Sequence, residues 1–348
     1  MNLKNKNSSS KINYNLGISL LKMLLCFWVV FAHTYKISNK LLYKLIKRKF
    51  HVPTFFLISF FFCSKNILSR NIQKVKLRFK RLLIPYILLP LIIWIVNNLL
   101  FIFYKFNRFG KILSIKELIS QYITGRIFHR IFWYQFNLIF ITLIYYIISF
   151  LFKKKLMLIL HILIIISYLL QYSGYNSKYF MKYKTSISYS LGNTVEVFPY
   201  TVTGFFFGYI DIIKLMLNFR FKIFYFSIIY IYIFFFFDIF INIKGFFYPG
   251  LLYNIGAIIL FIHFSLIPFK NNTNKYLISF IKTISNYTGG IYYFHMIIYD
   301  YIIRYKINLS IFTKNSITRS FIIYLFCYIF SFIGIKIFGK TQLKYLFF

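Results

Sequence analysis

Apolar runs of about twenty residues recur along the whole chain and are separated only by short polar stretches. A helix of about twenty apolar residues spans the hydrocarbon core of a bilayer, and in lipid only helices or closed barrels satisfy every backbone polar group. The hydropathy of the sequence places ten such runs, at 16–35, 52–64, 82–104, 132–152, 156–173, 196–216, 222–242, 247–268, 283–303 and 318–338. We therefore predict an all-α fold: a polytopic transmembrane bundle of about ten helices, with no separate soluble domain.

The composition agrees with a membrane location and argues against a nucleic-acid partner. Only 14% of the 348 residues are charged, whereas soluble domains have about 25%. The net charge of +38 comes from lysines and arginines in the short gaps between apolar runs. Juxtamembrane basic residues attract anionic lipid headgroups, so we expect membrane lipids as partners of this charge and no nucleic acid.

The sequence predicts one membrane domain, at residues 16–340, preceded by a short cytosolic tail at residues 1–15. The tail is polar and basic and has no small-residue cleavage pattern, so we expect a retained first helix rather than a removed signal peptide. Ten spans would place both termini on one face, which we expect to be the cytosolic one. Lysine and arginine are divided almost evenly between the two sets of loops, so the charge rule does not decide the orientation.

Two ionisable residues, Lys22 and His33, lie within the first apolar run. Eleven residues correspond to three helical turns with about 20° left over and a rise of about 16 Å, so both side chains lie on one face of the helix. Ionisable groups in spanning helices usually face the bundle interior or a water-filled cavity. The two residues therefore suggest a polar track through the bundle; alternatively, Lys22 extends to the near interface and His33 marks the far end.

A second basic feature, Arg78 and Arg81, lies in the polar stretch before the third span. Residues three apart share a helix face, and two guanidinium groups can bind phosphates through paired hydrogen bonds. The alternative is a basic collar at the lipid headgroups. The three cysteines have neither CxxC nor Cys/His spacing, so we predict no disulfide framework and no metal site.

Six segments carry a family resemblance: Lys22, ten residues and His33; VPTFFLISFFF at 52–62; RFKRLLIPY from Arg78 to Tyr86; FHRIFWYQFNLIF at 128–140; SLGNTVEVFPYTVTGFFFGYI at 190–210; and ISNYTGGIYYFHMII at 284–298. Together they resemble the bacterial membrane acyltransferase-3 family. Their order along the chain is that of the family motifs, and they cover almost the entire sequence.

The resemblance implies an integral O-acyltransferase of the cell membrane that moves an acetyl or other acyl group from acyl-CoA to a hydroxyl of a surface polysaccharide or lipid-linked glycan. His33 would be the catalytic histidine, and Lys22 would stand for the family's paired arginine. Arg78 and Arg81 would form a cationic pair that binds coenzyme A phosphates. Acyl-CoA would be the donor substrate, and no metal or prosthetic group is implied.

The sequence departs from the family pattern at two positions. Lys22 keeps the charge of arginine but lacks its planar fork, which would matter for bidentate recognition of the donor. Phe61 stands where the family usually has glycine, which puts a close approach between helices in doubt there.

Three further residues are candidates for binding the acceptor: Glu196, His295 and Trp133. Glu196 lies at the predicted start of a span between Asn193 and Pro199, where a broken helix entry would present an acid to the sugar; an interfacial ion pair with a lysine is the alternative. The family pattern implicates His295 in acceptor binding or packing and favours Trp133 over the many other aromatic residues.

Two other functions remain open from the sequence. A non-catalytic exporter or translocase of glycans or lipid-linked sugars could use Lys22, Arg78 and Arg81 to hold a pyrophosphate, and would need no histidine at position 33. A degenerate, inactive relative of the acyltransferases is the second alternative.

Overall fold

A computed structural model describes residues 15–34, 51–69, 71–104, 111–125, 132–172, 186–240, 251–269, 274–304 and 316–347. These residues form α-helices joined by turns and short 3₁₀ segments, with no strand among them. The all-α prediction is therefore confirmed. Residues 1–14 of the predicted cytosolic tail lie outside the described ranges.

Each of the ten predicted spans corresponds to a helix or to a pair of helices. The α-helices are α1 (Leu16–Thr34), α3 (His51–Leu68), α4 (Ile72–Tyr104), α5 (Ile115–Thr124), α6 (Phe132–Leu151), α7 (Leu156–Tyr172), α9 (Ser186–Ile210), α10 (Ile212–Met216), α11 (Arg220–Phe240), α12 (Leu251–Ser265), α13 (Lys275–Asn286), α14 (Thr288–Arg304) and α16 (Ser316–Phe338). Within the described part of the chain, α1, α3, α4, α6 and α16 are long and apolar enough to cross a membrane.

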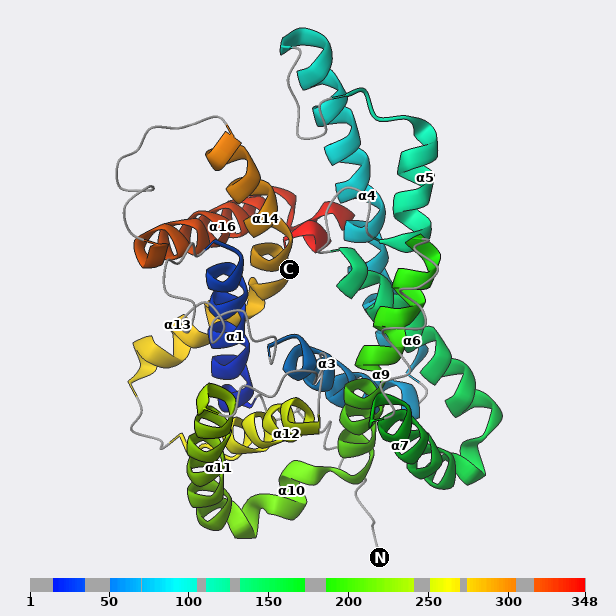
Figure 1. Ribbon diagram of the computed structural model, residues 1–348, viewed down its shortest axis with the longest axis vertical. Coiled ribbons are helices and arrows are strands. Elements are labelled where there is room, and N and C mark those ends of the chain that lie inside the picture. Colours follow the sequence, from blue (N-terminus) through cyan, green and yellow to red (C-terminus); the bar gives the residue numbers. More distant parts are fainter. Residues whose placement is uncertain are drawn as a thin grey trace, which may run out of the picture.

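The helices form two groups with α3 between them. Figure 1 shows α1, α13, α14 and α16 on one side of the bundle, and α4, α5, α6, α7 and α9 on the other. Helix α3 packs against α9, α12, α1, α6 and α4, while α1 packs against α13, α16, α14, α12 and α3. The helix that carries Lys22 and His33 therefore lies inside the bundle, in contact with five other helices.

Helices α9 and α3 pack closely against each other in the core. A Cβ atom at Gly204 would lie 2.4 Å from the carbonyl oxygen of Leu57, and one at Gly208 would lie 1.9 Å from Oγ of Ser64 and 2.4 Å from the carbonyl oxygen of Phe61. Two glycines four residues apart let helix backbones approach closely in membranes. The close approach that Phe61 put in doubt is therefore present, because α9 supplies the glycines.

Helix α5 was not predicted and lies alongside the second half of α4 (Figure 1). Near its start, Trp94 Nε1 and Asn98 Nδ2 of α4 donate to the Leu113 carbonyl at 2.9 and 3.0 Å. Near its end, the Tyr86 hydroxyl donates to the Tyr122 carbonyl at 2.7 Å. These bonds hold α5 antiparallel to α4.

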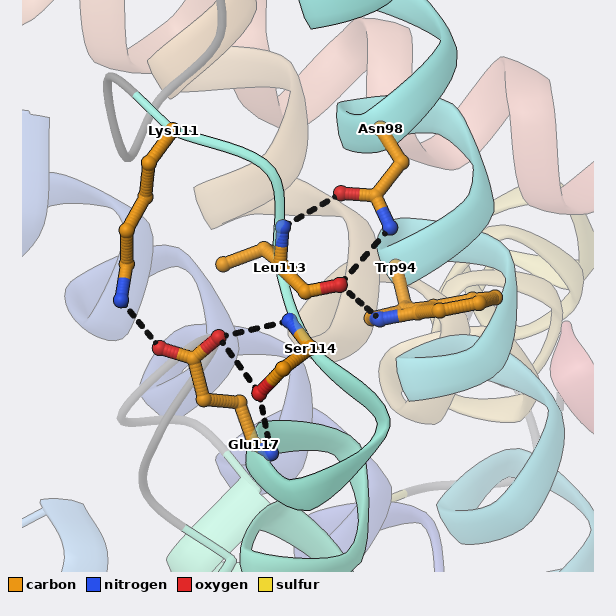
Figure 2. Close-up of polar contacts among 6 residues, drawn as sticks. All are labelled: Trp94, Asn98, Lys111, Leu113, Ser114 and Glu117. Atoms are coloured by element: carbon orange, nitrogen blue, oxygen red, sulfur yellow. Dashed lines mark hydrogen bonds and ion pairs between the residues drawn. The ribbon is translucent and has the colours of Figure 1, made fainter.

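A capping box begins α5. The Ser114 hydroxyl accepts from the Glu117 backbone N–H, the Glu117 carboxylate accepts from the Ser114 backbone N–H at 2.8 Å, and Lys111 pairs with the same carboxylate at 2.5 Å (Figure 2). The pattern Ser-x-x-Glu is typical of a helix start, so the start of α5 could have been predicted from the sequence.

Candidate active site

His33 is the penultimate residue of α1, and its side chain is exposed. The end of α1 is fixed by α16: the Thr34 hydroxyl lies 2.6 Å from the Ser320 hydroxyl, and Arg319 Nη1 donates to the Thr34 carbonyl at 3.4 Å. A cation at a helix C-terminus satisfies an otherwise unpaired carbonyl and opposes the helix dipole. Arg319, which sequence reasoning missed, thus positions the turn that carries His33.

His295 of α14 lies beside His33, with their ring centroids 5.3 Å apart. His295 is fully buried, and His51 at the start of α3 is close enough to interact with it electrostatically. Nδ1 of His295 is 2.7 Å from the Tyr292 carbonyl. The structure thus brings together two predicted site residues from opposite ends of the sequence and adds a third histidine.

A row of aromatic rings leads from His295 to Trp133. The ring centroids of His295 and Tyr292 are 5.8 Å apart, those of Tyr292 and Tyr134 5.1 Å, and those of Tyr134 and Trp133 6.4 Å. Trp133, at the second position of α6, is partly buried against Phe56 of α3. Trp133 therefore belongs to the same region as the histidines, through Tyr134 and Tyr292, which the sequence did not single out.

Lys22 lies at the other end of the polar face of α1 and is partly exposed. It is within electrostatic range of Arg81 on α4, whose side chain is exposed. Two cations on separate helices within this range can together attract an anion. The structure thus places Lys22 of α1 within electrostatic range of Arg81, one member of the predicted Arg78–Arg81 pair.

Arg78 is part of the protein framework. Its Nε donates to the Thr142 hydroxyl of α6 at 3.1 Å, and its Nη1 and Nη2 donate to the Ser59 carbonyl and hydroxyl of α3 at 3.4 and 3.0 Å. The guanidinium also lies over the Phe60 ring, 5.3 Å from its centroid. These bonds use three of the five guanidinium N–H groups, so two N–H groups remain that can donate to other acceptors.

The R-x-x-R pair was predicted to lie in a loop before the third span, and this prediction is wrong. Helix α4 begins at Ile72, ten residues before the predicted span, so both arginines lie within the helix. The polar residues 72–81 continue the helix because the start of an apolar run does not determine where a helix begins. Ser59 and Thr142, the partners of Arg78, lie near the midpoints of α3 and α6, which places the guanidinium well inside the bundle.

Comparison with protein families gives the family of this chain. Residues 15–337 match the acyltransferase domain of the Acyl_transf_3 family, a match that covers nearly the whole chain. The chain belongs to the membrane acyltransferase-3 family. No curated protein and no solved structure matches it. The acyltransferase is therefore a multi-pass membrane protein whose family identity rests on the sequence as a whole.

Glu196 occupies a different position in the acyltransferase from the predicted one. Helix α9 begins at Ser186 and continues past Pro199 to Ile210 without interruption, so Glu196 is not at a broken helix entry. Proline is tolerated within membrane helices because neighbouring groups satisfy the freed carbonyl. The side chain of Glu196 is partly buried.

Proposed function

We propose that this acyltransferase transfers an acetyl or other acyl group from acyl-CoA to a hydroxyl of a surface polysaccharide or of its lipid-linked precursor. The observation that carries the proposal is the polar face of α1. It presents His33 beside His295 at one end, and Lys22 within electrostatic range of Arg81 at the other, about 16 Å away by helical rise. A cationic end and a histidine end suit a donor whose phosphates and thioester are separated by the long pantetheine arm.

The chemistry requires a base at the histidine end. A sugar hydroxyl is a weak nucleophile at neutral pH, and histidine has an ordinary pKa of about 6.5, which suits a general base. In the proposed reaction, His33 accepts the hydroxyl proton while the sugar oxygen attacks the thioester carbonyl carbon. The C–O ester bond forms, the C–S bond breaks, and the proton passes to the departing thiolate, so that an O-acyl sugar and free coenzyme A are produced.

The cationic end has a distinct role in this proposal. Lys22 and Arg81 bind the coenzyme A phosphates by charge-assisted hydrogen bonds. Arg78, which is tied to Ser59 and Thr142, holds α3, α4 and α6 together beneath this site and contributes positive potential. We place the cationic end on the cytosolic side of the cell membrane, where acyl-CoA is made, with both termini on that side.

Mass spectrometry of surface glycans tests the proposal in cells. Cells with the wild-type gene, without the gene, and with His33→Ala are compared for glycan amount and for O-acyl groups per sugar. Acyl transfer predicts that O-acyl groups disappear in both altered strains while glycan export persists. If export stops and acylation per sugar is unchanged, the protein is a translocase; if nothing changes on deletion of the gene, it is an inactive relative.

A further inference from the structure

The two ring nitrogens of the buried His295 side chain differ in their hydrogen bonding. Nδ1 lies 2.7 Å from the Tyr292 carbonyl and 3.3 Å from the Ile291 carbonyl. Nε2 is fully buried and has no hydrogen-bond partner among the residues that the structure describes. Buried polar atoms nearly always have a hydrogen-bond partner, so we expect a ligand to supply the partner of this nitrogen beside His33.

The backbone bond fixes the chemical character of this nitrogen. A carbonyl oxygen only accepts hydrogen bonds, so Nδ1 of His295 carries the proton and donates it. In the neutral ring, Nε2 then has a free lone pair and acts as an acceptor. Because one turn of α14 imposes this tautomer, Nε2 is ready to receive a hydrogen bond without rearrangement.

We infer that His295 is the residue that positions the acceptor sugar, its Nε2 accepting a hydrogen bond from a sugar hydroxyl at the His33 ring. The inference rests on the proposed function and extends it to a second histidine with a different task. The 5.3 Å between ring centroids brings a hydroxyl bound to His295 into reach of His33. A hydroxyl-bearing ligand satisfies the buried acceptor, whereas a phosphate or carboxylate, which has no proton to donate, does not.

Two substitutions separate positioning from a purely structural role. The amide of asparagine reaches as far as Nδ1 of histidine, so His295→Asn keeps the bond to Tyr292 and removes the outer acceptor. The amide of glutamine reaches as far as Nε2, so His295→Gln restores an acceptor there and gives up the backbone bond. A positioning role therefore predicts that glutamine is the better replacement, and a structural role predicts that asparagine is.

The experiment uses the full chain in lipid nanodiscs, radiolabelled acetyl-CoA as donor and de-O-acylated surface glycan as acceptor. For His295→Asn we expect KM for the glycan to rise about tenfold, the loss of one hydrogen bond to a buried acceptor, with KM for acetyl-CoA unchanged. For His295→Gln we expect KM for the glycan to stay within about threefold of wild type.

Two results would overturn the inference: the opposite ranking of the variants, or an unchanged KM for the glycan in both. If His295→Asn does not fold, His295→Gln alone decides, because a positioning acceptor requires its KM for the glycan to remain near wild type. The wild-type protein tests the proposed function separately. Absence of transfer by wild type contradicts acyl transfer itself, whereas transfer with the reversed ranking contradicts only the role of His295.

Discussion

Arg78 donates hydrogen bonds to both the carbonyl and the hydroxyl oxygen of Ser59, at 3.4 and 3.0 Å, from a neighbouring helix. The same guanidinium also reaches Thr142 on a third helix. Ionisable groups inside membrane proteins are costly and are retained where they are paired with side chains or backbone carbonyls. The fork of Arg78 therefore links α3, α4 and α6 at one point.

Replacing Arg78 with lysine should destabilise the protein, because an ammonium group cannot reach the three acceptors in the same geometry. We expect a loss of about 2–4 kcal/mol, as for broken hydrogen bonds to a charged group, seen as a lower thermal unfolding temperature in detergent. Arg220→Lys is the matched control: Arg220 also lies over a ring, that of Phe221 at 4.9 Å, but is exposed. Equal stability of the two variants would contradict the linking role.

Gly208 should tolerate no side chain. A Cβ atom there would lie 2.4 Å from the Phe61 carbonyl oxygen, and the backbone of α3 cannot move aside without separating from α9. We expect Gly208→Ala to lower stability by about 1–3 kcal/mol, as for overpacked cores. Gly256→Ala is the control, since its Cβ would meet only Tyr230 at 3.9 Å, and alanine favours a helix. A neutral Gly208→Ala would contradict the close approach of α3 and α9.

Lys22 should act through its charge at the cationic end. Lys22→Met removes one of the two cations that we propose bind the donor there, so KM for acyl-CoA should rise about tenfold or more. Lys22→Arg restores the family residue and should keep KM for acyl-CoA near wild type. Lys214→Met, a change at an exposed lysine of α10, serves as the control. Unchanged donor KM in Lys22→Met would remove Lys22 from the donor site.

The start of α5 should depend on pH through Glu117. The hydrogen bond from Lys111 and the backbone bond from Ser114 lower the pKa of this carboxyl from its ordinary value of 4.5. A lowered pKa means that the carboxylate adds stability above pH 4.5, and that this stability is lost as the pH falls through the lowered value.

Hydrogen exchange of the α5 amides measures this effect. At pH 7, Glu117→Gln should exchange roughly three- to tenfold faster than wild type, as for the loss of one hydrogen bond. The difference should shrink on acidification and vanish once the wild-type carboxyl is protonated. Lys116→Gln, at the exposed neighbouring position, should show no such pH-dependent difference. A constant ratio at all pH values would show that the charge of Glu117 is not involved.

The sequence predicted the apolar part of the fold well and its polar extensions poorly. Ten apolar runs correspond to helices, because lipid permits few other structures. Helices α4 and α9 begin ten residues before their predicted starts, since polar residues continue a helix once it is packed on neighbours. The ninth predicted span, 283–303, includes a break, because α13 ends at Asn286 and α14 begins at Thr288. Hydropathy alone does not predict such a turn.

The candidate site was predictable only within single helices. Helical geometry alone aligned Lys22 and His33 on α1. The meeting of His33 with His295, and of Lys22 with Arg81, depends on how distant helices pack, which no local pattern contains. Arg319 was missed for the same reason, because its role depends on its contact with Thr34 at the end of another helix.

Acyl transfer by the purified protein tests the central claim most directly. The full chain in nanodiscs is given radiolabelled acetyl-CoA and de-O-acylated glycan, and label in the glycan and released coenzyme A thiol are measured together. Wild type should produce both in equal amounts. His33→Ala should lower the transfer rate at least about a hundredfold, as for loss of a general base, with donor binding retained.

The control for this measurement is His161→Ala. His161 is another membrane-helix histidine with a backbone contact, Nδ1 to the Met157 carbonyl at 2.8 Å, but it lies on α7, outside the candidate site. The account predicts that His161→Ala transfers acetyl groups at the wild-type rate while His33→Ala does not. Transfer by His33→Ala within a few-fold of wild type would contradict the account.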